Sequence, residues 1–443
     1  MRKFVLLTMT ALLLAGCSGG GGVDDDYIAD DPGGDQAYET DEDGNRVVKI
    51  WFHVDSKSAE GGAYQKRVDA FNAAYAEQKI KARPVFKART GGSAADYEKQ
   101  LIAAQTDGSL GDVITLDAPN CASYADSGLL YNITSAFTED EKKDFLSLNM
   151  YKDRVFGLPI QESSAGFYYN KNIFRDAGID VSGYTVENPW TFSEFKSVCQ
   201  KLKDRGLTAV DMRLDATKDE TATYLLYPII YAAGGDFVSA DGYTATGYFN
   251  KKESKDGFKF LKDLVTSGYT RYDIGATDFF TGKTGMYLSS GWTIPDLDHK
   301  FPDTFPNRES WGLLPYPKEV TRASATGSWS YAVTRNGVGD KQPAIELIKW
   351  MSSAESSNVV TNATGMIPAR KSCNPSYADG SPEKILLTQL EQTGRQRPAT
   401  VGYPQFTTAF SNIIVKIRDN DVDTTVDEIT KGLQAELDKL ANQ

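Results

Sequence analysis

Between residues 47 and 116 the sequence alternates between two kinds of periodicity, and this alternation restricts the fold more than any other feature. Runs of β-branched and aromatic residues predict strands at 47–54, 82–86 and 112–116. Between them, apolar residues spaced three and four positions apart predict helices at 63–78 and 94–106. Strands that alternate with helices form a parallel sheet covered by helices, because each crossover returns the chain to the same end of the sheet. The segment therefore predicts the α/β class.

The same alternation resumes after residue 160. A capping box at its start predicts a helix over 191–205. Apolar periodicity predicts further helices at 255–266, 344–361 and 426–440. A chain of 443 residues is also longer than one ordinary domain. We therefore expect an α/β protein with more than one lobe.

The first residues have the pattern of an export signal. Two basic residues precede a run at 4–15 that is apolar apart from two Thr. Its length suits the hydrophobic part of a signal peptide and is too short to span a membrane. The sequence Leu-Ala-Gly-Cys at 14–17 resembles the lipobox of bacterial lipoproteins, which implies that residues 1–16 are a signal peptide and that Cys17 is lipidated. An ordinary cleaved signal followed by a chance cysteine is the alternative.

A polar segment follows this cysteine. Residues 17–45 begin with a Gly-rich run and contain ten acidic and no basic side chains. Such a segment repels itself and has little apolar surface to bury, so we expect a flexible tether. The chain from residue 46 onward is nearly balanced in charge, and the net charge of −12 argues against a nucleic-acid partner. These features predict an extracytoplasmic protein anchored by lipid to the bacterial cell membrane.

Sequence motifs for catalysis are missing. The chain has two His and no HExxH, GxSxG, GxxxxGK[ST] or helix-opening GxGxxG motif. We therefore expect no metal, no cofactor and no enzymatic activity. Glycoside hydrolysis needs only a pair of Asp or Glu at no fixed spacing, so a surface-anchored glycoside hydrolase is the alternative. Beyond Cys17 the cysteines are Cys121, Cys199 and Cys373, which show no CxxC spacing, and at least one of the three must be a free thiol.

Two tryptophans stand beside Gly and Ser in turn-like sequences, namely Trp292 and Trp329. An aromatic face on a loop offers a flat surface for the apolar C–H face of a sugar ring, while nearby polar groups bind its hydroxyls. We expect Trp51, Trp311 and Trp350, which lie in predicted strands or helices, to pack in the core. The pattern of Trp292 and Trp329 favours a carbohydrate ligand.

A set of six short motifs resembles extracellular solute-binding protein family 1 of bacterial ABC importers, which is related to maltose-binding protein. The motifs are Gly108–Val113, Ala122–Leu130, Val155–Lys171, Pro189–Phe195, Phe279–Trp292 and Gly365–Arg370. The similarity runs from about Val47 to Ser372. One position departs from the pattern, since Gly111 stands where the family usually has Pro.

This resemblance implies a periplasmic-binding-protein-like fold of type II. Two α/β lobes are joined by strands that cross between them, and the ligand binds in the cleft. The crossings are expected near Pro159, at 317–323 and near Arg370. Lobe one would then comprise 46–158 and 322–370, and lobe two would comprise 159–321 and 371–443.

Strand ends and the family pattern together give the candidate ligand-binding residues. Trp292 and Trp329 are expected to stack on the ligand from opposite lobes, and Asp117 and Glu162 are expected to accept hydrogen bonds from its hydroxyls. The remaining candidates are His53, Asp55, Ser93, Asn120 and Arg370. Several have a structural alternative: packing for His53, an N-cap for Ser93 and a hinge salt bridge for Arg370.

The resemblance implies a binding subunit that captures a sugar or oligosaccharide and delivers it to the permease of an ABC importer. Closure of the lobes over the ligand would create the form that the permease recognises. We expect a monomer with no chemistry of its own. Besides the hydrolase, an adhesin or scaffold without a small-molecule ligand and a binder of another polyol or of an oligopeptide are alternatives.

Overall fold

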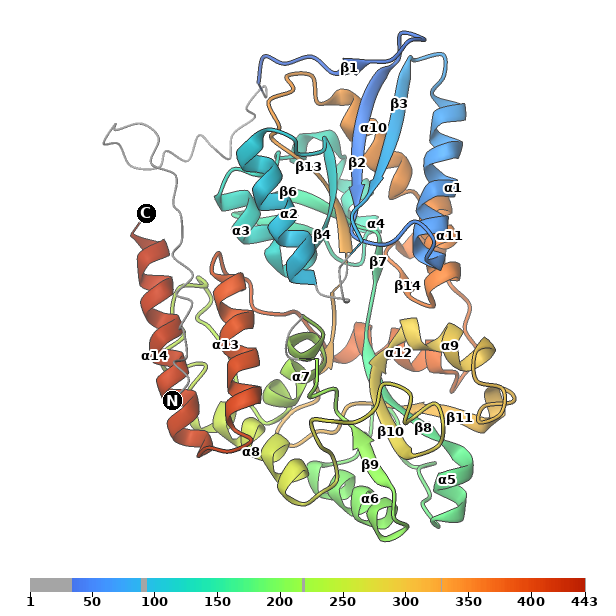
Figure 1. The fold of residues 1–443 in the computed structure, drawn as a ribbon, viewed down its shortest axis with the longest axis vertical. Coiled ribbons are helices and arrows are strands. Elements are labelled where there is room, and N and C mark those ends of the chain that lie inside the picture. The colour runs from blue at the N-terminus through green and yellow to red at the C-terminus, as the bar shows by residue number, and fades with distance from the viewer. Residues whose placement is uncertain (1–33, 89–93, 217–219, 328, 443) are drawn as a thin grey trace, which may run out of the picture.

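The structure is a computed structural model that describes residues 34–88, 94–216, 220–327 and 329–442. The described chain forms two lobes, one above the other in Figure 1, with segments that pass between them. Two residues with predicted roles lie outside the described residues, namely Ser93 and Cys17.

Lobe one is built on a seven-stranded sheet. Its strands are β1 (Glu39–Thr40), β2 (Arg46–Phe52), β3 (Ile80–Phe86), β4 (Val113–Asp117), β5 (Asn149–Tyr151), β6 (Arg154–Pro159) and β13 (Trp329–Val333). Strand β2 is parallel to both β3 and β4, whereas β13 is antiparallel to β4 and β6. The three strands predicted before residue 120 are therefore confirmed, and β3, which contains Pro84, pairs with β2 alone.

Helices cover both faces of this sheet. They are α1 (Ala59–Ala74), α2 (Ala94–Asp107), α3 (Cys121–Asp126), α4 (Glu139–Asp144), α10 (Gln342–Met351) and α11 (Ala354–Thr364). The single helix predicted at 344–361 is wrong, because the chain breaks between α10 and α11. The hydroxyl of Ser353 accepts a hydrogen bond from the Ser356 N–H at 3.3 Å, so a serine N-cap starts a new helix inside the apolar pattern.

The predicted tether at 17–45 is wrong for its last part. Strand β1 pairs with β2, and the Gln36 N–H donates to the Gly337 carbonyl at 3.0 Å. The acidic side chains find partners on neighbouring strands, since Glu39 lies 3.0 Å from Lys49 and Asp41 lies 2.9 Å from Lys81. These ion pairs replace the self-repulsion expected from the sequence alone, so lobe one includes residues before 46.

Lobe two contains a smaller, four-stranded sheet. In spatial order it consists of β11 (Trp311–Leu314), β8 (Ala165–Asn170), β10 (Thr284–Ser290) and β9 (Thr208–Asp211). Its helices are α5 (Lys171–Asp176), α6 (Phe192–Asp204), α7 (Glu220–Ala232), α8 (Lys252–Thr266), α9 (Ile294–His299), α12 (Pro382–Thr393), α13 (Tyr403–Lys416) and α14 (Val422–Ala441). The capping box is confirmed, because Thr191 and Glu194 exchange hydrogen bonds at the start of α6.

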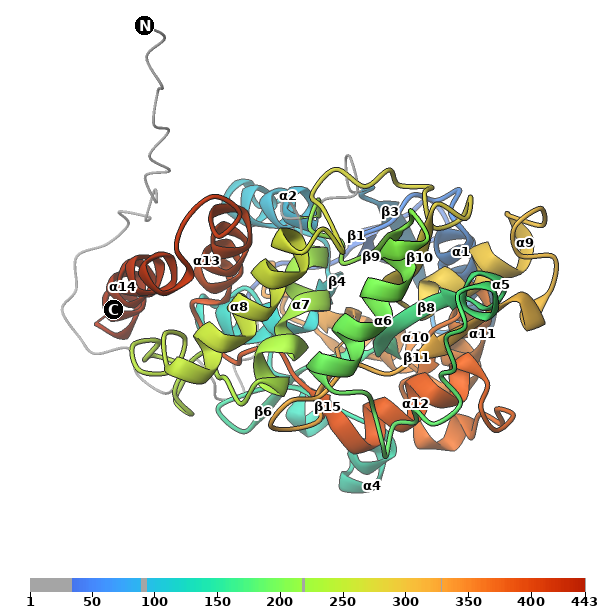
Figure 2. The same ribbon diagram turned by 90° about the horizontal axis from the view of Figure 1, so that it is seen from below.

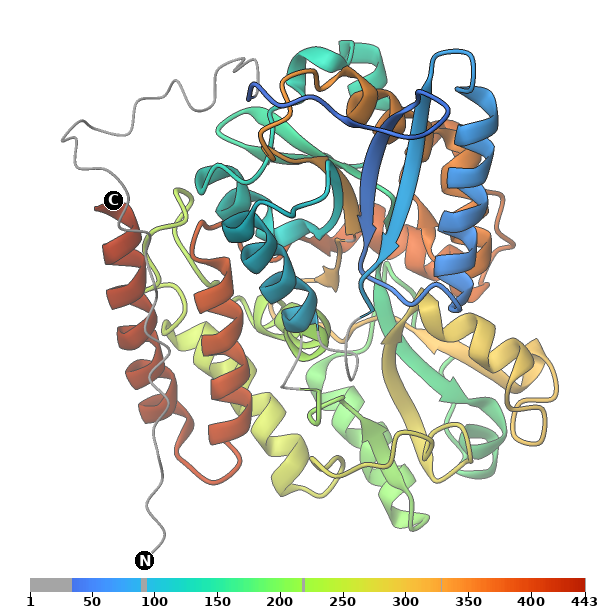
Figure 3. The ribbon, with the colours of Figure 1, turned by 45° about the horizontal axis from the view of Figure 1, so that its top comes forward.

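Helices α7, α8, α13 and α14 pack together into one group in lobe two (Figure 2). Helix α13 also contacts the 3-10 turn Ala118–Asn120 at the end of β4, so it reaches lobe one (Figure 3). The C-terminal helices therefore lie beside the boundary between the lobes.

Short strand pairs hold the crossings together. Strand β7 (Gln161–Glu162) pairs with β14 (Ile367–Pro368), and β12 (Ser324–Ala325) pairs with β15 (Gly394–Arg395). The middle crossing runs from β12 into β13, a few residues later than the predicted 317–323. Near the crossings the backbones of the lobes touch, because a methyl group on Gly291 would overlap the carbonyl oxygen of Gly365.

The tryptophans predicted in the core are buried or half-buried. Trp51 and Trp311 are buried, and the half-buried Trp350 packs edge-on against Phe71. Of the three cysteine thiols that the structure describes, all are free, which confirms that at least one is unpaired. Within the described part of the chain, no helix combines the length and the apolar character that a membrane crossing needs.

Candidate functional site

The carboxyl ends of β2 and β4 reach the boundary between the lobes, where ligands bind in open α/β sheets. His53 follows β2 and is buried, and its ring stacks on Trp329 with a centroid separation of 3.5 Å and an interplanar angle of 5°. Its Nδ1 lies 3.0 Å from the hydroxyl oxygen of Thr115. The structure thus brings two predicted ligand residues together, and His53 covers one face of Trp329.

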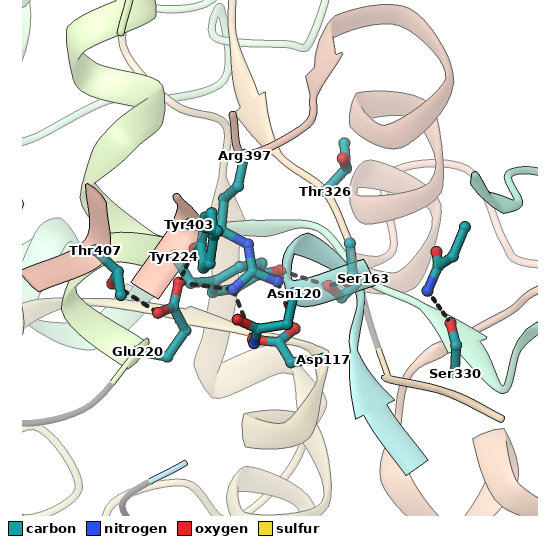
Figure 4. Close-up of polar contacts among 12 residues, drawn as sticks. Asp117, Asn120, Ser163, Glu220, Tyr224, Thr326, Ser330, Arg397, Tyr403 and Thr407 are labelled. Carbon is teal, nitrogen blue, oxygen red and sulfur yellow. Dashed lines mark hydrogen bonds and ion pairs between the residues drawn. The ribbon is translucent and has the colours of Figure 1, made fainter. Parts of the chain in front are cut away.

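A buried guanidinium lies at the end of β4. Arg397, between β15 and α13, donates from Nη2 and Nη1 to the two carboxylate oxygens of Asp117, at 2.7 and 2.9 Å (Figure 4). Its Nη1 also lies 2.8 Å from Glu220, the first residue of α7. The side chains of Arg397, Asp117 and Glu220 are 4%, 7% and 14% exposed. Asp117, predicted as an acceptor for sugar hydroxyls, therefore has a guanidinium as its partner here.

More carboxylate and hydroxyl groups surround this ion pair. The hydroxyls of Tyr403 and Thr407 both donate to Glu220, the latter at 2.7 Å. Burial raises the pKa of Glu220, and the nearby Arg397 opposes that rise. On the lobe-one side, Glu98 of α2 accepts a hydrogen bond from the Asn120 side-chain amide at 2.7 Å. Burial, together with the nearby carboxylates of Asp117 and Glu220, raises the pKa of Glu98 to about 8.

Aromatic rings from lobe two lie next to this network. Trp292 is in the 3-10 turn Gly291–Thr293 after β10, and 40% of it is exposed. Its ring lies 5.8 Å from the ring of Tyr224, tilted by 44°. The Tyr224 hydroxyl lies 2.6 Å from that of Ser163, and the Arg397 guanidinium lies 5.4 Å from the Tyr224 ring. The exposed indole of Trp292 and the polar network around Arg397 thus both lie at the boundary between the lobes.

A cavity of about 520 Å³ lies beside the crossings, a volume typical of small-molecule sites. It is lined by residues of both lobes and of the crossing segments, among them Pro119, Asn149, Met150, Glu162, Thr326, Ser330, Leu390, Gln396 and Arg397. In Figure 4, Thr326 and Ser330 lie on one side of Arg397, and Glu220 and Thr407 lie on the other. Arg397 lines this cavity, whereas Glu220 is not among its lining residues.

Glu162 of β7 lines this cavity and is 3% exposed. It accepts a short hydrogen bond from the hydroxyl of Ser147. Burial raises the pKa of Glu162 to about 7, against the opposing effect of hydrogen bonds from Ser147 and the Ser163 backbone. The protonated form of this carboxyl group therefore persists to a higher pH than it would in water.

Two predicted site residues have structural roles in the described chain. Asp55 is exposed and accepts a hydrogen bond from the Lys57 N–H at 2.7 Å, in the turn before α1. Arg370 lies 3.0 Å from Asp144 and donates from Nε to the Ser352 carbonyl at 2.6 Å. It does not line the cavity, and its contacts match the salt bridge that was its alternative.

The sequence reasoning missed Glu220, Tyr224 and Arg397. Tyr224 lies in an almost continuous apolar helix, where a ring at the lobe boundary looks like any core ring. Glu220 at the start of that helix is a usual residue for a helix N-terminus. No local pattern distinguishes Arg397. Among the described residues, no group of three or more His, Cys, Asp or Glu side chains is arranged to hold a metal ion.

Comparisons with known proteins agree with this architecture. The family model for bacterial extracellular solute-binding proteins matches residues 66–384. A protein of Brucella abortus named only as a binding protein is 21% identical over 384 residues, 82% of this chain and 90% of the relative. The maltooligosaccharide ABC transporter solute-binding lipoprotein of Streptococcus pneumoniae is 22% identical over 414 residues, 88% of this chain and 85% of the relative.

Among solved structures, the cyclic alpha-maltosyl-1,6-maltose binding protein from Arthrobacter globiformis has the same fold. Its TM-score is 0.73 at 23% sequence identity, and the match covers 89% of this chain and 99% of that one. The two-lobed fold expected from the sequence is confirmed.

Proposed function

Because the chain belongs to the bacterial extracellular solute-binding protein family, we propose that it captures a sugar or oligosaccharide between its lobes and delivers it to an ABC importer. The observation that carries this proposal is the exposed indole of Trp292, which lies against the Tyr224 ring beside the buried ion pair of Arg397 with Asp117. Sugar rings need both surfaces, since their C–H faces stack on aromatic rings and their hydroxyls form hydrogen bonds.

The names of similar proteins support the same substrate class. The Streptococcus pneumoniae relative is named for maltooligosaccharides, and the Arthrobacter globiformis protein is named for a cyclic maltosyl-maltose. In this chain, Trp292 would contact the ligand from lobe two, and Trp329 and Asn120 would contact it from lobe one. Contacts from both lobes form together only when the lobes close, so the ligand would favour the closed conformation over the open one.

Thermal unfolding of the purified protein tests this proposal with maltose, maltotriose, a cyclic maltooligosaccharide and unrelated sugars. A ligand at 100 times its Kd stabilises the native state by about 2.7 kcal/mol, which shifts Tm by roughly 2–4 °C in a chain of this length. Trp292→Ala should abolish the shift. Tyr248→Ala, which removes another exposed aromatic ring of lobe two, should retain it. No shift with any sugar would refute the proposed substrate class.

A glycoside hydrolase was the main alternative. The matched family and the named relatives are binding and transport proteins, which favours capture over turnover. Two carboxylates of the site, Asp117 and Glu220, are also both paired with Arg397 rather than placed around an open position. Incubation with maltoheptaose should therefore leave the oligosaccharide intact, and the appearance of shorter sugars would restore the hydrolase interpretation.

We also propose that the protein acts outside the cytoplasm as a monomer, anchored to the cell membrane through a lipid on Cys17. The supports are the hydrophobic run at 4–15, the lipobox-like sequence at 14–17 and the relative named as a lipoprotein. Cys17→Ala should release the protein from membranes into the soluble extracytoplasmic fraction. Unchanged membrane fractionation of this variant would refute the anchor.

A further inference from the structure

Three ionisable side chains from three separate segments meet at the lobe boundary. Asp117 ends β4 in lobe one, Glu220 begins α7 in lobe two, and Arg397 lies on the segment between β15 and α13 (Figure 4). The ion pair of Arg397 with Glu220 lies within lobe two. The pair of Arg397 with Asp117 joins the two lobes.

The lobe-two half of this cluster is held in place independently of lobe one. Glu220 accepts hydrogen bonds from Tyr403 and Thr407, both on α13. Helix α13 packs against α7, and the Thr223 and Thr407 hydroxyls lie 2.8 Å apart across that contact. A movement of lobe one would therefore leave Arg397 beside Glu220.

The lobe-one half of the cluster is the carboxylate of Asp117, whose backbone is fixed at the end of strand β4. Asp117 pairs through the backbone with Trp329 of β13, so it moves with the lobe-one sheet. Arg397 binds both of its oxygens in a bidentate geometry, which is the strongest and most directional form of such a pair. Separation of the lobes would break these two hydrogen bonds while the contacts of Glu220 remain.

We propose that Arg397 is a positioning residue that latches the closed lobes together through Asp117. This inference deepens the proposed function, on which it rests, since it concerns the closure of the same binding site. The bond forms only when β4 and the segment after β15 come together, so its free energy favours the closed conformation over the open one. A ligand that requires closure then binds more tightly because part of the closing energy comes from the protein.

Removal of the guanidinium should do more than delete this bond. Asp117 and Glu220, which share this guanidinium, would then lie close together at the boundary without a compensating cation, and like charges at short range repel. Arg397→Met should therefore weaken binding of maltotriose at least tenfold. Arg397→Lys, which retains the charge without the bidentate geometry, should lose less affinity.

Isothermal titration with maltotriose and small-angle X-ray scattering without sugar test the latch on the purified full-length chain. The variants are Arg397→Met, Arg397→Lys, Asp117→Asn and the double variant Asp117→Asn/Arg397→Met. Arg67→Met is the matched control, because Arg67 is equally buried and pairs with Glu355 within lobe one at 2.6 Å. Circular dichroism confirms that each variant is folded.

The latch predicts that Asp117→Asn and Arg397→Met each weaken binding and that the double variant is no weaker than Arg397→Met, since both remove the same bond. It also predicts a larger radius of gyration for Arg397→Met than for Arg67→Met. Losses that multiply in the double variant would assign the residues to separate ligand contacts and overturn the latch. If maltotriose does not bind the wild type, the proposed ligand is wrong, and the latch is then tested by the radius of gyration alone. An Arg397→Met variant with the same radius of gyration as Arg67→Met would overturn the latch.

Discussion

The buried carboxyl group of Glu162 predicts an unusual dependence of stability on pH. Glu162 is on the crossing strand β7, is 3% exposed and has a pKa raised to about 7 from an ordinary 4.5. Because the folded pKa lies above the unfolded one, folding favours the protonated form. The stabilisation that the Glu162 carboxyl group contributes is therefore fully present below pH 4.5 and is lost as the pH rises through about 7.

The size of this loss follows from the difference in pKa. A difference of about 2.5 pKa units corresponds to about 3 kcal/mol of unfolding free energy between acidic and mildly alkaline solution. Glu162→Gln keeps the shape of the side chain and its ability to bond with Ser147, but it cannot ionise. The variant should match the wild type near pH 4.5 and exceed its stability by up to about 3 kcal/mol at pH 8.

Urea unfolding of the wild type and Glu162→Gln at half-unit steps between pH 4.5 and 8 measures this difference. Comparison of the two proteins at each pH cancels the titration of all other groups, including Glu98. The reasoning is refuted if the two stability curves run parallel over this range. Maltotriose titration of the same variant tests the earlier expectation that Glu162 accepts a ligand hydroxyl, which requires a loss of affinity.

Three further predictions concern separate parts of the molecule. Trp292→Phe should retain part of the sugar affinity that Trp292→Ala loses, which titration calorimetry measures. Because the ring is 40% exposed, the Tm of this variant in the absence of sugar should lie within about 1 °C of the wild-type value. Gly291→Ala should force the lobes apart at Gly365 and lower sugar affinity at least tenfold, whereas Gly62→Ala, at an open helical position, should not. Deletion of residues 34–45 from the mature protein should lower Tm by several degrees, since β1 and its ion pairs pack on β2; an unchanged melting curve would show that the segment is a tether after all.

Local sequence patterns determined most of the secondary structure. The strands and helices of lobe one up to residue 120 have patterns that each element carries within itself: β-branched runs for β2 and β4, and apolar spacing for α1 and α2. The capping box of α6 is equally local, since Thr191 and Glu194 are three residues apart. The predictions failed where a single residue overrode a pattern, as Ser353 does between α10 and α11.

The sequence also singled out residues that the structure places at the lobe boundary. Trp292 stood out because it lies in a Gly-containing turn, and the structure leaves it exposed at the lobe boundary. His53 and Trp329 were both named, but their stacking on each other is a contact between residues 276 positions apart that no local pattern contains. No local pattern contains the ion pair between Glu39 and Arg83 either, and Glu39 belongs to the segment that was expected to be a tether.

By itself, then, the sequence determined the α/β class and the alternation of its elements, because those depend on spacing along the chain. Its six short motifs also resembled the family to which the chain belongs. Only the tertiary structure decided which charges meet. Asp117, Glu220 and Arg397 come from β4, α7 and the segment after β15, and they form one buried cluster because the two lobes fold against each other. A buried ion pair depends on the distance and desolvation of its groups, and both are set by packing rather than by any local run of residues.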